Sequence, residues 1–589
     1  MASLIQKLSQ NVGAAFAAEG LEAAFGAVRI SDRPDLAQFQ CNGAMAAAKA
    51  AKKNPRQVAE AVVARLQSDP TFTRLEIAGP GFINLTISDA VLGAHVSEIA
   101  ADRARAGVSP LGHSETIVLD YGGPNVAKAM HVGHLRSSII GDSLRRILKF
   151  AGFNAIGDVH MGDWGTPMGM IISELELRHP DWPYFDAAKT SGYPSESPVS
   201  MEDLEVIYPQ AASACKEDPE RMAKAQAATA ELQNKRPGYY ALWQHFIDVS
   251  ISAMKANFDA LNVHFDLWKG EACVHDLIAP MVDQLKKDGF AIEDQGAIVV
   301  PVKRESDTKE IPPLILYKRD GAVMYGTTDM ATLVERMQDL NPARMIYVVD
   351  QRQHLHFDQV FRAGRLSGIV PESVELTHAG FGTMNGTDGK PFKTRAGGVM
   401  KLEDLIAMGI ERANQRLSEA EIGKDFSPEE KEDIAYKVAI AAIKFADLQN
   451  NRIADYVFDL DRLTSFEGKT GPYLLYQAVR IRSLLEKAGV DPDTYSAPIT
   501  VTDADRKLLL ALCELPEIID VACRNYTPHV LCDHAFRLAQ EFSSFYAGTH
   551  ILSETDTAKK NSWLMMCAAV YTQLSLLLTL LGLLLPRRM

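Results

Sequence analysis

Along residues 113–445 the hydrophobic and polar positions predict strands and helices in alternation. The apolar run 116–119 predicts a buried strand, and the amphipathic pattern over 135–151 predicts a helix. Farther on, 313–331 predicts a strand, an Asp-Gly turn, a second strand and the start of a helix, and 345–349 predicts another buried strand. Such alternation favours an α/β fold with a Rossmann-like, doubly wound parallel sheet.

The pattern differs on both sides of this central part. Residues 1–112 combine helical stretches at 42–53 and 55–66 with a strand after a Gly-Pro-Gly turn within 75–87 and a helix to about 105, which suits a small α+β domain. Residues 446–589 predict an all-α helical bundle. Within the centre, about 175–270 reads as a mostly helical insertion with a polar loop at 187–200.

The junction between the 116–119 strand and the following helix carries the strongest candidate chemistry. A turn of Gly-Gly-Pro-Asn at 122–125 leads to a helix start, where unpaired N–H groups and the helix dipole favour an anion. His131 and His134 are three apart and share a helix face, while Gly133 leaves room for a ligand. With Lys128 nearby, this suits a triphosphate, although a surface histidine pair or a metal site remains open.

Composition and charge narrow the function classes. Hydrophobic residues make up 47% and charged residues 23%, as in ordinary globular proteins, and 589 residues favour about three domains. The net charge of −14 argues against indiscriminate nucleic-acid binding, but local basic patches could still hold an RNA. Seven scattered cysteines without a Cys-x-x-Cys pair indicate neither a disulfide framework nor a zinc site.

We therefore expect reduced thiols, a cytoplasmic location and no metal held by the protein itself. The N-terminus shows no signal-peptide pattern. The very apolar run 574–585 is too short to span a bilayer, so we expect a buried C-terminal helix and no membrane partner.

The string at 124–142, Pro-Asn-Val-Ala-Lys-x-Met-His-Val-Gly-His-Leu-Arg-Ser-x-Ile-Ile-Gly-Asp, resembles arginyl-tRNA synthetases of bacterial type. Its His-Val-Gly-His is similar to the HIGH signature of class I aminoacyl-tRNA synthetases. The resemblance implies ATP-dependent ligation of L-arginine to tRNA(Arg) through an arginyl-adenylate, with Mg²⁺ accompanying ATP. It also implies that ATP is bound by Pro124, His131, Gly133, His134 and Met384.

Further blocks resemble the family's arginine pocket. Guanidinium recognition needs carboxylates at fork geometry. By resemblance, Glu271, Tyr325 and Asp329 face the guanidinium, and Asn125 and Gln353 hold the α-amino end. The family usually has Gly-Glu-Ser where this chain has Gly-Glu-Ala at 270–272. A helix cap is the alternative role for Asp329, and Asp163 in the Gly-Asp-Trp-Gly block could bind ligand hydroxyls or cap the next helix.

A loop rich in Gly, Lys and Thr follows at 386–398. It stands where class I synthetases carry the KMSKS loop, in the degenerate form Lys-Pro-Phe-Lys-Thr. Lys390 and Lys393 could stabilise the leaving pyrophosphate, although a plain basic surface loop is also possible. In the family a lysine at the position of Lys128 is thought to compensate for the degenerate loop.

Two distant regions are candidates for tRNA contact. Phe82 and Asn84 stand two apart on a strand, in a string that resembles the family's D-loop-binding N-terminal domain, although Phe82 could be plain core. The C-terminal part resembles the family's anticodon-binding bundle, and its candidates are Tyr473, Gln477, Arg480, Arg587, Arg588 and Met589.

We expect a monomer that binds tRNA(Arg), L-arginine and ATP. Two alternatives stay open at this point. One is a ligase for another polar amino acid on the same fold, against which the acidic pocket argues. The other is a non-catalytic tRNA-binding paralogue, against which the intact His131, Gly133 and His134 argue.

Overall fold

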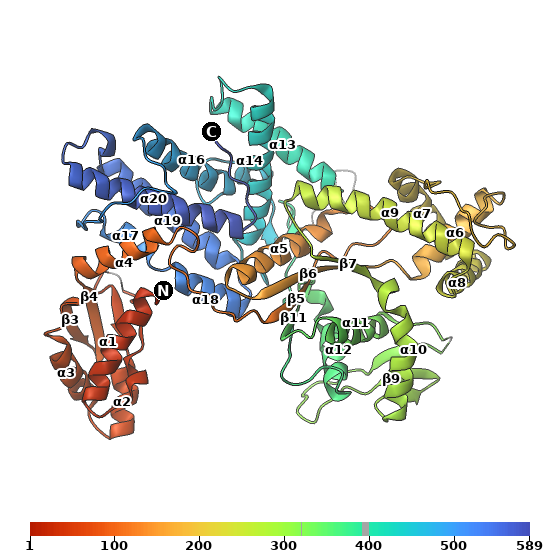
Figure 1. The fold of residues 1–589 in the computed structure, drawn as a ribbon. Coiled ribbons are helices and arrows are strands. Elements are labelled where there is room, and N and C mark those ends of the chain that lie inside the picture. Colours follow the sequence, from red (N-terminus) through yellow and green to blue (C-terminus); the bar gives the residue numbers. More distant parts are fainter. Residues whose placement is uncertain (34, 320, 391–399) are drawn as a thin grey trace.

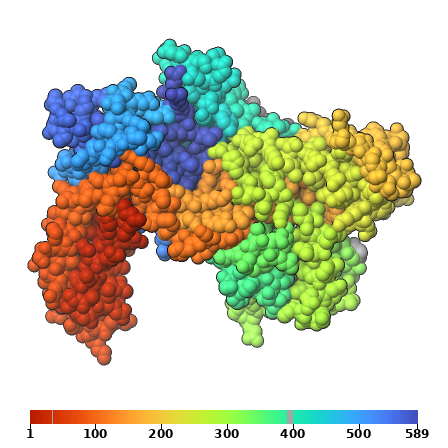
Figure 2. Space-filling model, in the orientation of Figure 1, coloured from red at the N-terminus to blue at the C-terminus, as the bar shows by residue number. Residues whose placement is uncertain are grey.

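The computed structural model describes residues 1–33, 35–319, 321–390 and 400–589. An N-terminal unit, a central sheet, a helical arm and a C-terminal helical bundle follow one another along the chain (Figure 1). In the space-filling view, the N-terminal unit and the region around residues 290–340 project from the same side of the centre, and the surface is hollowed between them (Figure 2).

The N-terminal unit packs helices against a four-stranded antiparallel sheet, in the order β1-β2-β4-β3. The strand expected after the Gly-Pro-Gly turn is β4, and the residues ahead of the turn form its hairpin partner β3. Gly79 and Gly81 both have positive φ, which this tight turn requires. The elements are α1 (Leu4–Ala18), η1 (Ala23–Gly26), β1 (Val28–Ile30), β2 (Phe39–Cys41), α2 (Gly43–Ala51), α3 (Pro55–Leu66), β3 (Phe72–Ala78), β4 (Phe82–Ile87) and α4 (Asp89–Ala101).

The centre is a five-stranded sheet in the order β12-β11-β5-β6-β7, and every neighbouring pair is parallel. This confirms the Rossmann-like α/β prediction. Because the carboxyl ends of parallel strands meet at one edge, the loops after β5, β6, β7 and β11 come together there. The elements are β5 (Thr116–Asp120), η2 (Val132–His134), α5 (Leu135–Phe150), β6 (Asn154–Met161), β7 (Leu267–Gly270), α11 (Tyr325–Asp339), β11 (Arg344–Tyr347), η3 (Gln351–Gln353), α12 (His354–Leu366) and β12 (Glu375–His378).

The expected helical insertion is present as an arm beside the sheet (Figure 1). Residues 179–200 form no helix or strand, as their polar composition predicts. At the far end of the arm, β7 falls inside the 175–270 range and returns the chain to the parallel sheet. The arm consists of α6 (Thr166–Arg178), α7 (Met201–Glu217), α8 (Pro219–Gln233) and α9 (Pro237–Ala260).

A small antiparallel sheet, in the order β10-β9-β8, stands next to α10. The second strand expected within 313–331 is wrong: after β10, a single bridge joins Tyr317 to Val323. Helix α11 begins at Tyr325, only two residues later, which leaves no length for a strand. The elements are α10 (Glu271–Lys287), β8 (Ile292–Asp294), β9 (Ala297–Val300) and β10 (Leu314–Tyr317).

The C-terminal part is helical as expected, apart from a two-residue parallel pairing of β13 with β14. The division expected at 445/446 falls inside α14, which continues without a break. The elements are β13 (Met384–Asn385), α13 (Leu402–Glu419), α14 (Pro428–Leu448), β14 (Tyr456–Val457), α15 (Leu460–Leu463), α16 (Gly471–Lys487), α17 (Arg506–Leu512), α18 (Leu515–Asn525), α19 (His529–Gly548), η4 (Ile551–Ser553) and α20 (Thr557–Leu580).

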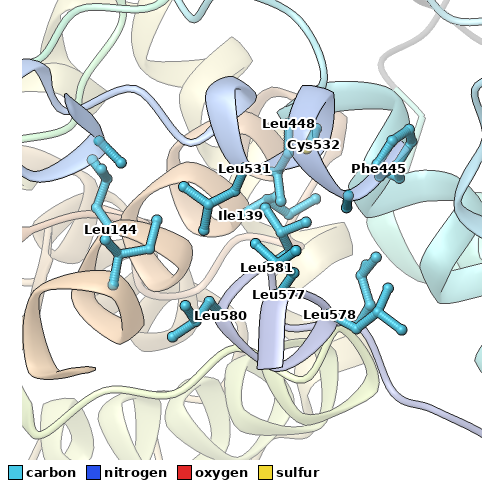
Figure 3. Close-up of a cluster of buried hydrophobic side chains, with 14 of the residues drawn as sticks. Ile139, Leu144, Phe445, Leu448, Leu531, Cys532, Leu577, Leu578, Leu580 and Leu581 are labelled. Atoms are coloured by element: carbon cyan, nitrogen blue, oxygen red, sulfur yellow. The ribbon is translucent and has the colours of Figure 1, made fainter. Parts of the chain in front are cut away.

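The bundle and α5 share one hydrophobic core. Buried Ile139 and Leu144 of α5 belong to the same cluster as Phe445 of α14, Leu531 of α19 and Leu577 of α20 (Figure 3). Each of these side chains is fully buried, so the contact is part of the folded core rather than a loose domain interface. The helix that follows the His-Val-Gly-His segment is therefore fixed directly against the bundle.

Helix α20 is long and apolar enough to cross a membrane by length and composition alone. However, 72% of its most apolar window is buried inside the protein. The expectation of a buried C-terminal helix is confirmed, although α20 begins earlier and ends at Leu580.

Candidate active site

The two histidines of the His-Val-Gly-His segment cap each other's backbone at the start of α5. His131 Nδ1 accepts the Gly133 N–H at 3.0 Å, and His134 Nδ1 accepts the His131 N–H at 3.1 Å. The ring centroids lie 4.1 Å apart with the planes 37° from each other. Since both Nδ1 atoms accept, each neutral ring carries its proton on Nε2. The pair therefore offers two Nε2–H donors side by side.

Electrostatics keep both imidazoles uncharged at neutral pH. Burial, followed by the charge of Lys128, lowers the pKa of His131. Burial and the neighbouring His131 lower the pKa of His134 to about 3. Gly133 between them is exposed, and a Cβ there would come within 2.6 Å of the His131 ring. The glycine is therefore required for the present position of that ring.

Cationic side chains surround this segment, and two of them are held by helix α7 of the arm. The Lys128 ammonium lies 4.6 Å from the centre of the Tyr208 ring, and Lys401 Nζ lies 2.6 Å from Glu205. Lys401 also pairs with His131 through a backbone bridge, because Val132 N–H donates to Met400 O at 3.0 Å.

The residues expected to act in the degenerate KMSKS-like loop are placed only in part. Lys390 is exposed, and its carbonyl accepts the Gly386 N–H at 2.7 Å. Lys393 lies outside the described residues. Met384 is buried, 7% exposed, in the short strand that pairs with β14. Both flanks of the loop are thus paired with other backbone segments: β13 with β14, and Lys401 with His131.

A cavity of about 290 Å³ opens at the same edge of the sheet and is lined by three of the five predicted arginine-binding residues; Asp329 and Gln353 are not among its lining residues. Asn125, Glu271 and Tyr325 line it, together with Trp164 and His275. Pro124 is buried at its edge, and its carbonyl accepts the Gly162 N–H at 3.2 Å. Burial, followed by the charge of Asp329, raises the pKa of Glu271 to about 7.

Asp329 stands on the first turns of α11, one helical turn after Tyr325. Its Oδ2 lies 2.5 Å from His356 Nε2, on the first turn of α12. Helix α11 has no side-chain cap, so the cap suggested as the alternative role of Asp329 is not what the structure contains. Gln353 is exposed in η3, directly before α12, and does not line the cavity.

Asp163 does not cap the next helix, α6, which has no side-chain cap; it caps α10 instead. Its Oδ1 accepts the Ala272 N–H at 3.0 Å, so the helix that begins with Glu271 is capped from another element. A Cβ at Gly270 would come within 2.4 Å of Asp163 Oδ2, so this approach requires glycine. Where the family usually has serine, this chain has Ala272. Asp163 accepts the backbone N–H of this residue, so the capping contact does not involve its side chain.

The candidate tRNA contacts lie far from this cavity along the chain. In the N-terminal sheet Phe82 is half-buried, while Asn84 is 6% exposed and its Oδ1 accepts from Gln40 Nε2 at 2.9 Å. On α16, Tyr473 packs edge-on against Phe536 and Gln477 is 4% exposed.

Four further candidates lie in the C-terminal part, where Arg587 and Arg588 are exposed and Arg480 and Met589 are partly buried. Arg480 lies over the ring of Tyr546 at 4.4 Å. Arg588 is bound to Glu430 at 2.7 Å. Their role in tRNA binding stays a prediction.

Comparison with known proteins decides the family. The model of "tRNA synthetases class I (R), catalytic domain" matches residues 95–460, that of the "DALR anticodon binding domain" matches 474–589, and that of the "Arginyl tRNA synthetase N terminal domain" matches 2–87. The arginine–tRNA ligases of Hyphomonas neptunium and Maricaulis maris are each 51% identical to this chain over the full length of both proteins. The chain belongs to the arginine–tRNA ligase family.

Solved structures agree on the fold. Arginyl-tRNA synthetase from Plasmodium falciparum covers the whole chain with a TM-score of 0.81 at 24% identity. The Thermus thermophilus arginyl-tRNA synthetase does so with 0.79 at 21% identity. The resemblance stated from the sequence is confirmed, and the two alternative functions give way to an arginine–tRNA ligase.

Sequence reasoning missed several residues that contact the basic and acidic side chains of the candidate site. Tyr208 and Glu205 come from a helix about 80 residues beyond Lys128, so no local motif connects them. His356 lies on the first turn of α12, three residues after Gln353, and belongs to none of the predicted motifs. The spacing of two from His354 was the only signal for it, and two histidines two apart on a helix point in different directions.

Proposed function

We propose that this arginine–tRNA ligase, which attaches arginine to tRNA in protein synthesis, forms arginyl-adenylate in the cleft between the histidine pair and the acidic cavity. The arginine carboxylate attacks the α-phosphorus of ATP, an O–P bond forms, and pyrophosphate leaves. The 3′-terminal adenosine of the tRNA then attacks the adenylate carbonyl through a ribose hydroxyl, and AMP leaves. Positioning and fixed charges supply most of the catalysis.

The histidine end binds the phosphates. His131 and His134 donate Nε2–H bonds to phosphate oxygens where negative charge grows in the transition state. Because both rings stay neutral, they donate without titrating in the working range. Lys128, Lys390 and Lys393 supply positive charge for the leaving pyrophosphate. The backbone around Gly133 and Pro124, together with Met384, holds the nucleotide.

The acidic end selects arginine. Glu271 and Asp329 carry the negative charge that a guanidinium fork requires, and Tyr325 adds a phenol hydroxyl. Asn125 and Gln353 hold the α-amino end. A cation bound between two carboxylates that repel each other lowers their electrostatic free energy, and a neutral group does not. The pair of Glu271 and Asp329 therefore favours arginine over neutral side chains.

Magnesium enters with ATP in this scheme. The groups around His131 are imidazole N–H and ammonium donors, and the described residues contain no cluster of three His, Cys, Asp or Glu side chains able to hold a metal ion. The residues present therefore fit a Mg²⁺ held by the phosphates and water rather than by the protein. No step is assigned to it.

The tRNA is bound at both ends of the chain. Phe82 and Asn84 contact the D-loop, and Tyr473, Gln477, Arg480 and the 587–589 tail contact the anticodon side. We place this ligase in the cytoplasm as a monomer, with no membrane partner.

The observation that carries the proposal is the polarity of this region: Nε2–H donors and lysines around the histidine pair, and the buried Glu271 beside Asp329 on the other side. The test is aminoacylation of total tRNA with each of the twenty labelled amino acids in turn. Charging with arginine and no other amino acid is expected. Charging with a different amino acid, or with none, would overturn it.

A further inference from the structure

Asp329 is already engaged before any substrate binds. Its Oδ2 is 2.5 Å from His356 Nε2, while Oδ1 takes part in none of the hydrogen bonds found among the described residues. Neither side chain is freely exposed, at 22% for Asp329 and 31% for His356. A carboxylate at the end of a short side chain rotates about χ2, and a bond to one oxygen fixes where the other points.

We propose that His356 is a positioning residue for arginine recognition: it holds Asp329 through Oδ2 so that Oδ1 faces the substrate guanidinium, and its protonation weakens arginine binding. The inference rests on the proposed role of Asp329. His356 touches neither substrate nor nucleotide in this scheme, and it acts through the carboxylate alone.

The helix geometry supports this assignment. Asp329 lies on α11 and His356 on α12, and these two neighbouring helices pack on each other. The His356 ring meets Phe357 edge-on at 5.3 Å, and Phe357 in turn packs on Tyr347 and His378. The imidazole is thus held from behind by an aromatic cluster, which suits a fixed donor.

Other titratable groups lie around Asp329 and His356, and their effects on the pH dependence must be distinguished from that of His356. Burial raises the pKa values of Tyr347 on β11 and Tyr317 on β10, so neither ionises near neutrality. His354 on α12 and His378 on β12 face each other, with Nδ1 atoms 3.4 Å apart. Glu271 on α10, beyond Asp329, has a pKa of about 7.

The direction of the pH effect follows from the ion pair. The hydrogen bond that His356 donates to Asp329 raises the pKa of His356 above its ordinary value. Below that pKa the imidazolium neutralises Asp329 and repels a guanidinium, and above it the neutral ring still donates Nε2–H. Arginine binding should therefore strengthen as pH rises through the pKa of His356.

Two substitutions separate positioning from charge. His356→Gln keeps an amide donor and cannot be protonated, so its arginine KM should match wild type at pH 8 and lie below wild type at pH 6. His356→Ala removes the donor, so its arginine KM should rise about tenfold over wild type at pH 8, the effect of a lost hydrogen bond to a charged group. At pH 6 the rise should be smaller, because the wild-type imidazolium already weakens arginine binding there. The KM for ATP should stay within twofold in both variants.

The control is His354→Gln, which removes a titratable ring from the same helix without touching Asp329. It should keep the wild-type ratio of arginine KM at pH 6 to that at pH 8. Glu271 titrates in every variant, so a residual pH dependence is expected in His356→Gln.

If His356→Gln keeps the full wild-type ratio, or if His356→Ala binds arginine as wild type does, the inference is wrong. If the proposed function is wrong, the result differs: the wild-type protein itself will not charge tRNA with arginine at either pH.

Discussion

The two histidines at the start of α5 act as a unit at the scale of single residues. Each uses its Nδ1 to cap backbone, and this bond selects the tautomer that offers Nε2–H. The backbone N–H groups of the turn therefore determine which ring nitrogen of each histidine carries the proton. Replacing either ring by alanine removes one preorganised donor and one backbone cap together.

For His131→Ala or His134→Ala we expect the aminoacylation rate to fall by about two to three orders of magnitude. Arginine KM should change little, because the carboxylates proposed to bind arginine, Glu271 and Asp329, lie on α10 and α11. Steady-state kinetics with arginine and tRNA measure both quantities. Near-normal rates in both variants would remove the histidines from the phosphate site.

Gly133→Ala tests whether the position of the ring matters. An added Cβ would come within 2.6 Å of His131 Cε1, so the ring must turn away. We expect the rate to fall about as far as in His131→Ala, with the fold retained. Gly548→Ala is the control, because Gly548 ends α19 and a Cβ there meets nothing within 4 Å. Equal activity of Gly133→Ala and wild type would contradict the geometry.

Glu271 gives a pH prediction. Its pKa is raised to about 7 by burial and by Asp329, so protonation removes the carboxylate as pH falls through that value. Arginine KM should rise as pH drops from 8 to 6, since a neutral acid binds a guanidinium poorly. Glu271→Gln should have a high KM that no longer carries this transition. A Glu271→Gln enzyme with the wild-type KM at pH 8 would exclude the residue from the pocket.

At the scale of elements, sequence could find what neighbouring residues encode. The 116–119 run became β5, and 55–66 became α3 with Asn54 as its cap, because periodicity and capping are local signals. Glu271 and Asn125 reached one cavity because parallel strands deliver their loops to one edge, and Tyr325 joins them from the start of α11, which follows β10 of the small antiparallel sheet. Local patterns do not report which distant helix faces which, so Glu205, Tyr208 and His356 were missed.

One contact between distant elements has a large expected effect on stability. Arg136 on α5 bonds Asp447 on α14 at 3.0 Å, with side-chain exposures of 3% and 0%. Arg136→Met leaves a buried carboxylate without its cation, which costs about 3–5 kcal/mol. Urea unfolding followed by tryptophan fluorescence should show a lower midpoint.

The matched control is Arg524→Met, which breaks the surface pair with Asp520, where the arginine is 75% exposed. A surface pair contributes about 0–1 kcal/mol, so its midpoint should stay near wild type. Adding Asp447→Leu to Arg136→Met should recover part of the loss, because it removes the stranded charge. An unchanged midpoint for Arg136→Met would show that the pair is not a stabilising link between α5 and the bundle.

The whole molecule must hold a polyanion although its net charge is −14. The overall field repels tRNA at long range, so binding has to come from local contacts. We expect one at each end of the chain: the half-buried Phe82 beside the buried Asn84, and the exposed tail of Arg587 and Arg588. These differ in chemistry, since an aromatic ring stacks on a base whereas an arginine pairs with a phosphate.

Salt dependence separates the two ends. Phe82→Ala should weaken tRNA binding without changing the slope of log affinity against log salt, because no phosphate contact is lost. Arg587→Ala should weaken binding and reduce that slope by about one. Arg588→Ala should have a smaller effect on the slope, since Arg588 is already paired with Glu430 and stacked on Phe426 at 4.2 Å. The measurement is tRNA affinity across a salt series, with Lys287→Ala on the distant α10 as control. Wild-type affinity and slope in both Phe82→Ala and Arg587→Ala would move the tRNA contacts to the helical arm.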